Sequence, residues 1–261
     1  MKRKKRILYM VCILCLAGAA FSGWKLYLEI QPRVQAESVY EEIRTSAFPE
    51  SLVNLERVDN GDQNEDTYSG RGRPDFALLR EWNPDVAGWL YGPGTSIDYP
   101  VVQGTDNEYY LNHTSDGQRS IIGSVFMESK NRDDFQDDLT VIYGHHIRGG
   151  RMFSSLSNYK KQSYYEEHPM LILYTPEGDY RIDLFASEIL NGKTAIFTLM
   201  FGSEEKREAW INEVIASSAF NSEIYPEEGE KMIALCTCTY EYQDARYAVY
   251  GILKPLEEEN R

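Results

Sequence analysis

The sequence is poor in cysteine, with 4 in 261 residues. Two of these, Cys12 and Cys15, lie in an apolar run near the N-terminus, so only Cys236 and Cys238 remain for the rest of the chain. A scaffold built on disulfides needs a much higher density of cysteine. The fold must therefore depend on a hydrophobic core.

Positive charge is also scarce, with 27 Lys and Arg against 41 Asp and Glu and a net charge of −14. Five of the basic residues stand together at positions 2 to 6, which makes the remainder of the chain more acidic still. A surface of this charge repels polyanions, so we expect no nucleic-acid partner.

Charge is missing altogether from residues 7 to 23, directly after the basic residues. Extended to residue 28, this run is long enough as a helix to cross a hydrocarbon layer about 30 Å thick. The pattern predicts a single transmembrane anchor over residues 7–28, with residues 1–6 in the cytoplasm and the remainder on the extracytoplasmic face. A cleaved signal peptide is the competing interpretation, but its apolar core is usually shorter, about 7–15 residues.

Two further segments follow the anchor. Residues 29–74 are interpreted as a stem or linker, with a loose helical pattern broken by Pro49 and then a stretch, 58–74, almost without apolar side chains. A compact domain is expected over residues 75–261. It should begin with a short helix that starts near Pro74 and ends near Pro84.

The compact domain is expected to be mainly β. Roughly eight short β segments separated by turn residues run from Val86 to Lys254, which favours an antiparallel barrel or sandwich. Two helical insertions are predicted among them. One covers residues 152–169, and the clearer one covers 203–220, where Ser203 can cap the helix.

The segment KMIALCTC, residues 231–238, has apolar residues on both faces and should be a central strand. Alternation places Cys236 and Cys238 on the same face. If the next strand pairs with it as a hairpin, Arg246 becomes the cross-strand neighbour of Cys238. A guanidinium beside a thiol stabilises the thiolate, which is the reactive form.

Other roles of the two cysteines are less favoured. A disulfide between positions i and i+2 of a strand would be strained. A metal site would need two more ligands, and the adjacent His145 and His146 point to opposite sides if they continue a strand, so we expect neither a metal nor another cofactor. His145 follows the predicted strand 139–143 and Gly144, where it can act as acid or base toward a thiol.

Taken together, these motifs resemble the sortases, and within them class B, which are membrane-anchored cysteine transpeptidases of Gram-positive bacteria. The carrying residues are YGHH at 143–146, LCTC at 235–238 and an Arg eight residues after Cys238, with class B-like segments at 83–113 and 123–127. The resemblance covers roughly residues 75–255. It implies an eight-stranded sortase barrel with Cys238, His145 and Arg246 on its floor, whereas Cys236 stands where the family usually has a small residue such as Ser.

The resemblance also implies the reaction. The Cys238 thiolate attacks a carbonyl in the C-terminal sorting motif of a secreted protein, Arg246 holds the oxyanion or the motif, and His145 transfers protons. An amine of a peptidoglycan precursor, or of a pilin subunit, then takes over the acyl group. The same resemblance places four residues in the substrate groove: Asn107, Leu111, Thr237 and Ile196.

Two functions from other classes stay open at this point. One is an anchored thiol–disulfide oxidoreductase that uses Cys236 and Cys238, although such enzymes usually carry C-x-x-C at the start of a helix and this chain has C-x-C on a strand. The other is a non-catalytic interaction module of the cell envelope.

Overall fold

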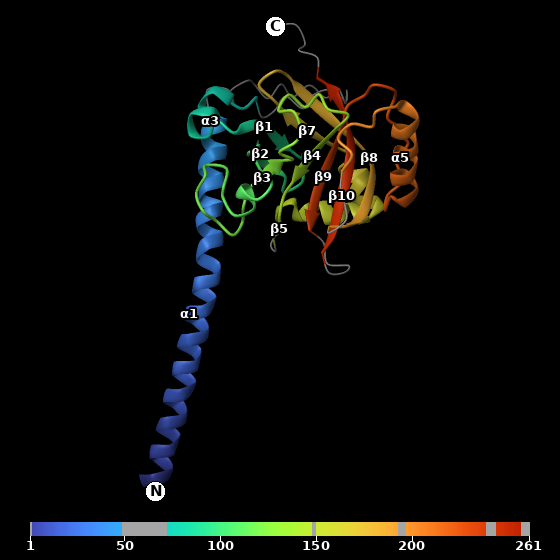
Figure 1. Cartoon of the computed structure of the whole chain (residues 1–261). Helices are drawn as coiled ribbons and strands as arrows, with labels where there is room; N and C mark the ends of the chain where they lie inside the picture. Colours follow the sequence, from blue (N-terminus) through green and yellow to red (C-terminus); the bar gives the residue numbers. More distant parts are fainter. Residues whose placement is uncertain (1, 49–71, 148–149, 193–196, 239–243, 257–261) are drawn as a thin grey trace, which may run out of the picture.

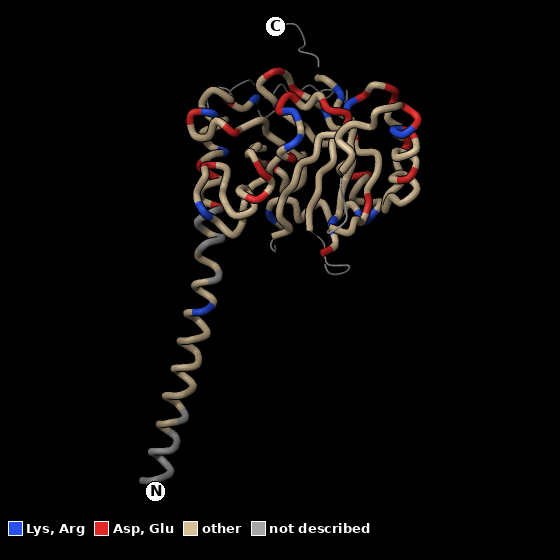
Figure 2. Tube along the Cα trace, in the orientation of Figure 1, with Lys and Arg blue, Asp and Glu red and all other residues tan. Residues whose placement is uncertain are grey.

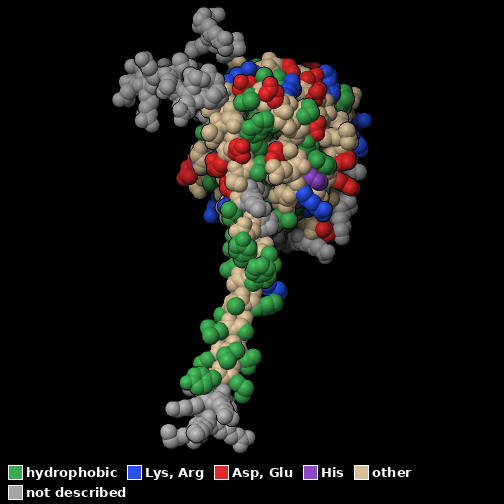
Figure 3. All heavy atoms as spheres, turned by 90° about the vertical axis from the view of Figure 1, so that its left-hand side faces the viewer, with side chains coloured by type: hydrophobic (Ala, Val, Ile, Leu, Met, Phe, Trp, Pro, Cys, Tyr) green, Lys and Arg blue, Asp and Glu red, His purple; other side chains and the backbone are tan. Residues whose placement is uncertain are grey.

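A computed structural model of the protein describes residues 2–48, 72–147, 150–192, 197–238 and 244–256. The chain begins with one continuous helix, α1 (Lys2–Ala47), which projects from a compact domain (Figure 1). Large apolar side chains, Ile13, Leu16 and Phe21 among them, are exposed along its free part (Figure 3). In the described part of the chain, no helix is long and apolar enough to cross a membrane.

The last turns of α1 pack on the compact domain, although these residues were expected to belong to a stem. Tyr40, Ile43 and Ala47 are buried there. The Tyr40 hydroxyl donates a hydrogen bond of 2.7 Å to the carbonyl oxygen of Gly123. The helix ends at Ala47, two residues before Pro49, as expected because proline cannot continue a helix.

The short helix predicted at the start of the domain is α3 (Phe76–Trp82). The Asp75 side chain caps it by accepting a hydrogen bond from the backbone N–H of Leu78. Phe76 and Leu79 are its buried residues, so α3 is held on the barrel by its apolar face.

The domain is a closed barrel of eight strands in the order β1-β2-β3-β4-β9-β10-β8-β7 (Figure 1). The strands are β1 (Val86–Tyr91), β2 (Asp98–Val102), β3 (Val125–Met127), β4 (Leu139–Tyr143), β7 (Met170–Tyr174), β8 (Asp179–Asn191), β9 (Met232–Cys238) and β10 (Ala245–Pro255). The predicted number of strands is confirmed. A separate pair, β5 (His146–Ile147) and β6 (Arg151–Met152), follows β4.

The expectation of an antiparallel barrel was wrong for two of the strand pairs. The pairs β2–β3 and β4–β9 are parallel. Parallel neighbours need a long crossover. The crossover from β2 to β3 is the segment 103–124, which contains the 3-10 helix η1 (Tyr109–Leu111). The crossover from β4 to β9 consists of all the elements between these two strands.

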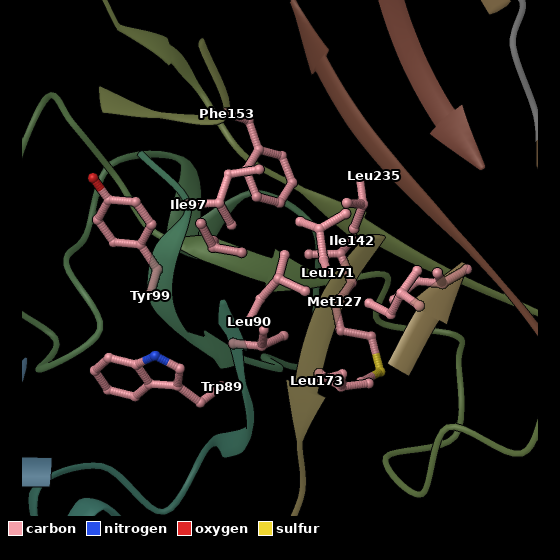
Figure 4. Packing of buried hydrophobic residues seen from close by; sticks show 14 of the residues in the cluster. Trp89, Leu90, Ile97, Tyr99, Met127, Ile142, Phe153, Leu171, Leu173 and Leu235 are labelled. Carbon is pink, nitrogen blue, oxygen red and sulfur yellow. The ribbon is translucent and has the colours of Figure 1, made fainter. Parts of the chain in front are cut away.

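The core fills the barrel and continues outside it. The larger cluster, which Figure 4 shows from close by, includes Leu90 and Leu235 in the barrel, and it extends to Trp89, whose ring packs against Phe48 just after α1 with the ring centroids 5.2 Å apart. A second cluster lies between the outer face of β9 and helix α5 (Glu204–Ser217), with Met232 and Ala234 packed near Ile211. Strand β9 is therefore buried on both faces, as predicted for a central strand.

Both helical insertions are present. α5 lies within the predicted range 203–220, and the Ser203 side chain caps it by accepting a hydrogen bond from the backbone N–H of Lys206. The region 152–169 is helical but divided into the 3-10 helix η2 (Phe153–Lys160) and helix α4 (Gln162–Glu167), with extended backbone at Lys161 between them. Figure 2 shows that Asp and Glu are spread over the domain surface, including α5.

Replacing Ile211 by Ala should destabilise the domain, because Ile211 is fully buried between α5 and the barrel. We expect a loss of about 2–5 kcal/mol in the free energy of unfolding, measured by urea denaturation. Ile121→Ala is the matched control, since Ile121 is 59% exposed and the same substitution there should change stability by less than about 0.5 kcal/mol. Similar losses in the two variants would contradict the packing described.

Candidate active site

A pocket of about 410 Å³ opens at the ends of the strands that carry the predicted site residues. Strands β3, β4, β8, β9 and β10 contribute to it, together with η1 and the residues just before η1. Its lining residues are Asn107, Leu111, Phe126, Tyr143, Gly144, His145, Leu190, Gly192, Phe197, Cys236, Thr237, Cys238 and Arg246. The structure thus brings together six of the seven residues named from the sequence, while Ile196 lies outside the described residues.

Cys238 is the last residue of β9 and is partly exposed. Strands β9 and β10 are antiparallel neighbours, and their register pairs Cys238 directly with Arg246. The predicted cross-strand pair is therefore confirmed. A thiol in this position is accessible from the pocket and stands next to a permanent positive charge.

Arg246 lines the pocket, and its side chain lies close to Gly192. A Cβ atom added at Gly192 would lie 3.0 Å from Cγ and 3.1 Å from Cζ of Arg246. The arginine side chain therefore occupies space that is free because residue 192 is a glycine. The backbone N–H of Gly192 donates to the carbonyl oxygen of Asp244 at 2.8 Å, which holds the end of β8 against the start of β10.

His145 reaches the pocket because the pairing of β4 with β9 continues past the end of β4. Tyr143 pairs with Cys236, and the next residue, Gly144, donates its backbone N–H to the carbonyl oxygen of Cys236 at 3.1 Å. The Thr237 hydroxyl donates to the carbonyl oxygen of Gly144 at 2.7 Å. These contacts tie the residue before His145 to the strand that ends in Cys238.

The imidazole of His145 has a defined tautomer. Its Nε2 atom lies 2.7 Å from the carbonyl oxygen of Leu111. A carbonyl oxygen can only accept a hydrogen bond, so Nε2 carries the proton and Nδ1 is left for proton exchange in the pocket. His146 lines a different hollow, where its Nδ1 lies 3.3 Å from the Ser157 hydroxyl.

The Leu111 carbonyl and the His145 ring approach each other over Gly123. This glycine has φ +63°, and an added Cβ would come within 2.7 Å of the Leu111 oxygen and 2.8 Å of Cδ2 of His145. Gly123 is thus required both for its backbone conformation and for the space that it leaves.

The groove residues predicted from the sequence differ in how accessible their side chains are to a ligand in the pocket. Asn107 and Leu111 line the pocket, and Leu111 is 42% exposed. Thr237 also lines it, but this residue is buried and its hydroxyl is engaged with Gly144.

Sequence reasoning missed the aromatic and aliphatic wall. Phe126 and Tyr143 lie with their ring centroids 5.3 Å apart, and Phe197 and Leu190 also line the pocket. The sequence held one sign of this wall: Tyr143 stands two residues before His145 and therefore lies near the predicted site.

Cys236 differs from Cys238 in its environment. It lines the pocket but is only 2% exposed, and burial raises the pKa of its thiol to about 12. Both cysteines are free thiols. A thiol with such a pKa stays protonated at neutral pH and is a poor partner for dithiol exchange. Within the described residues, no group of three or more His, Cys, Asp or Glu side chains is placed to hold a metal ion.

Comparison with known proteins identifies the family to which this chain belongs. The family model described as "Sortase domain" matches residues 90–254, which is more than half of the chain. The chain belongs to the sortase family.

Curated relatives refine the assignment to class B. This sortase is 26% identical to Sortase B of Listeria monocytogenes over 255 residues, covering 97% of this chain and 99% of the relative. It is 27% identical to Sortase B of Staphylococcus aureus over 255 residues, covering 98% and 99%. Among solved structures, the "Staphylococcus aureus sortase B-substrate complex" matches with a TM-score of 0.73 and 25% identity, covering 87% of this chain and 100% of that one.

The chain is therefore a class B sortase, a cysteine transpeptidase. The alternative of a thiol–disulfide oxidoreductase is not supported by any of these comparisons. The buried, protonated Cys236 also argues against it.

Gly123→Ala should impair this sortase by displacing the Leu111 carbonyl or the His145 ring. We expect a loss of about 10²-fold in kcat/KM, because the sequence predicts that His145 transfers protons and a misplacement of about 1 Å costs on this order. Gly178→Ala is the control, because no atom lies within 4 Å of a Cβ added there. Cleavage of a sorting peptide, followed by chromatography, measures both. Equal activity of the two variants would contradict the crowding at Gly123.

Proposed function

We propose that Cys238 is the nucleophile of this sortase, with His145 as proton donor and acceptor and Arg246 as the group that holds the oxyanion or the motif backbone. The observation that carries the proposal is the convergence of these three side chains on one pocket at the ends of β4, β9 and β10. Each of the three residue types suits its role in acyl transfer.

The first half-reaction forms a thioester. The Cys238 sulfur, as thiolate, attacks a carbonyl carbon of the sorting motif, and the resulting oxyanion is stabilised by the guanidinium of Arg246. The reacting form pairs the Cys238 thiolate with a His145 that is protonated on both ring nitrogens, and as the C–N bond breaks, the leaving amine takes one of these two protons. Because Nε2 is engaged with the Leu111 carbonyl, we assign this transfer to Nδ1.

The second half-reaction releases the product. An acceptor amine attacks the thioester carbonyl and gives its proton to Nδ1 of His145. The C–S bond then breaks, a new amide bond is complete, and the Cys238 thiolate and the protonated His145 are restored. No cofactor enters the balance of the two steps.

The proposed substrate is a secreted protein with a C-terminal sorting signal, and the proposed acceptor is an amine of a peptidoglycan precursor or of a pilin subunit. The support is family membership together with the likeness to a class B sortase solved as a substrate complex. Asn107, Leu111 and Thr237 are proposed to contact the motif, since all three line the pocket. Ile196 stays a proposal that rests on the resemblance alone.

We also propose the layout expected from the sequence: residues 1–6 in the cytoplasm, 7–28 as a single-pass anchor, 29–74 as a stem and 75–261 as an extracytoplasmic catalytic domain. The support is the uncharged run at residues 7 to 23 behind five basic residues. The packed end of α1 adds that part of this stem, around Tyr40 to Ala47, rests on the catalytic domain.

Cys238→Ala should abolish both peptide cleavage and the covalent intermediate, because the thioester forms on this sulfur. Intact-protein mass spectrometry of the full chain with a library of sorting peptides identifies the acylated residue. Cys236→Ser is the matched control and should keep activity, since the Cys236 thiol is buried and protonated. Detection of the acyl group on Cys236 would overturn the assignment.

Arg246→Lys tests whether geometry or charge matters at this position. Lysine keeps the positive charge near Cys238 but loses the planar pair of donors. We expect peptide cleavage to fall by about 10²–10³-fold, as after the loss of other oxyanion donors. Alkylation of Cys238 by iodoacetamide should continue at a near-normal rate. Cleavage close to wild type would leave Arg246 only an electrostatic role.

A further inference from the structure

Glu128 lies just behind the wall of the pocket, directly after β3. A single carboxylate oxygen, Oε2, accepts two hydrogen bonds: one from Nδ2 of Asn107 at 2.7 Å and one from the hydroxyl of Tyr143 at 3.0 Å. Asn107 and Tyr143 both line the pocket, whereas Glu128 is not among the lining residues. The carboxylate therefore acts on the groove through two other side chains.

The contact determines how the Asn107 amide is oriented. Its Oδ1 atom accepts a hydrogen bond of 2.8 Å from the backbone N–H of Ser129, while its Nδ2 donates to Glu128. With both ends of the amide engaged, a flip would place a donor against a donor and an acceptor against the carboxylate. One N–H and one lone pair of Asn107 remain for a ligand.

The second contact holds Tyr143 as a neutral hydroxyl. Burial and then the nearby charge of Glu128 both raise the pKa of Tyr143 above its ordinary value. The hydroxyl therefore keeps its proton and donates it to Glu128, which leaves its oxygen with lone pairs as an acceptor. A hydrogen bond to a charged acceptor is among the stronger ones in a protein.

The turn after β3 is also closed by groups other than this carboxylate. Its backbone is closed by the Asn131 N–H, which donates to the carbonyl oxygen of Glu128 at 3.0 Å. Nε2 of Gln103 donates to the carbonyl oxygens of Glu128 and Asn131 at 3.0 and 2.7 Å. Within the described residues, the other carboxylate oxygen, Oε1, accepts longer hydrogen bonds of 3.3 Å from the Ser129 hydroxyl and the Lys130 backbone N–H. The two shorter hydrogen bonds of the side chain, 2.7 and 3.0 Å, come from the pocket residues Asn107 and Tyr143.

We propose that Glu128 is a positioning residue for substrate binding, which joins the segment of Asn107 to the end of β4 and fixes the polar atoms that both present to the sorting motif. This inference rests on the proposed function of the pocket. Since the carboxylate holds the wall of the groove, its loss should weaken binding of the peptide rather than slow the chemical step at Cys238.

The test compares three substitutions at Glu128 in the full-length chain. Glu128→Ala removes the acceptor. Glu128→Asp keeps the charge but draws the carboxylate back by one methylene, and it serves if the Ala variant does not fold. Glu128→Gln loses the charge but keeps an oxygen that can accept both hydrogen bonds. Glu177→Ala, an exposed glutamate in the turn between β7 and β8, is the control.

We expect Glu128→Ala and Glu128→Asp to raise KM for a sorting peptide by about tenfold, because Asn107 and Tyr143 lose the acceptor that orients them, with kcat within about threefold of wild type. Glu128→Gln and Glu177→Ala should stay within about threefold of wild type in KM. Hydrogen–deuterium exchange over residues 104–113 should become faster in the Ala and Asp variants only, because it reports on the tether without any substrate.

An unchanged KM in the Asp variant, or a Gln variant as impaired as the Ala variant, would overturn the positioning role. Unchanged hydrogen exchange in both the Ala and Asp variants would overturn the tether itself. Failure of the wild-type chain to form a thioester at Cys238 would instead refute the proposed function, and the exchange measurement would still decide whether Glu128 holds the Asn107 segment.

Discussion

The site depends on the register of β9 between its two neighbours. On one side β9 pairs in parallel with β4, and on the other it pairs antiparallel with β10. The first register places Gly144 beside Cys236, so that His145 comes next, and the second places Arg246 opposite Cys238. Because side chains alternate along a strand, a shift of one residue in either register would turn Cys238 away from the pocket or remove its partner. The two buried faces of β9, one inside the barrel and one beneath α5, oppose such a shift.

The crossover segment 103–124 carries a second set of constraints, which come from outside the barrel sheet. Its Leu111 carbonyl orients His145, and its Asn107 amide is held by Glu128. Gly123 leaves room for the histidine ring, and the carbonyl of the same glycine accepts a hydrogen bond from Tyr40 at the end of α1. The N-terminal helix is thus in contact with the segment that positions the imidazole. This contact couples the part of the chain proposed as a stem to the groove.

Much of this arrangement could be predicted from local patterns. Apolar residues on both faces of 232–238 indicated a central strand, and the short polar stretch after it indicated that Arg246 would lie opposite Cys238. Ser203 and the acidic residues after it marked the start of α5. The identity of the three central pocket residues came from the resemblance of separated motifs to the sortases, which local periodicity alone does not supply.

Other features arise from contacts between distant segments, which a single sequence does not encode in any local pattern. The parallel pairing of β4 with β9 joins residues about ninety positions apart, and the hydrogen bond from His145 to a main-chain oxygen leaves no trace in residue type. The packed end of α1 was expected to be part of the stem, because the many charged residues there left no clear apolar pattern that would mark Tyr40, Ile43 and Ala47 as buried. Glu128 was passed over because nothing in its neighbourhood in the sequence indicates that it meets Asn107 and Tyr143.

We expect the strand register to bring Cys238, His145 and Arg246 to the same reacting carbonyl. A crystal structure of the protein with a sorting peptide bonded to the Cys238 sulfur tests it most directly. We predict that the Arg246 guanidinium donates to the carbonyl oxygen of the bonded residue, that Nδ1 of His145 faces the reacting group, and that Nε2 stays on the Leu111 carbonyl. A bonded peptide whose carbonyl points away from both Arg246 and His145 would contradict the account.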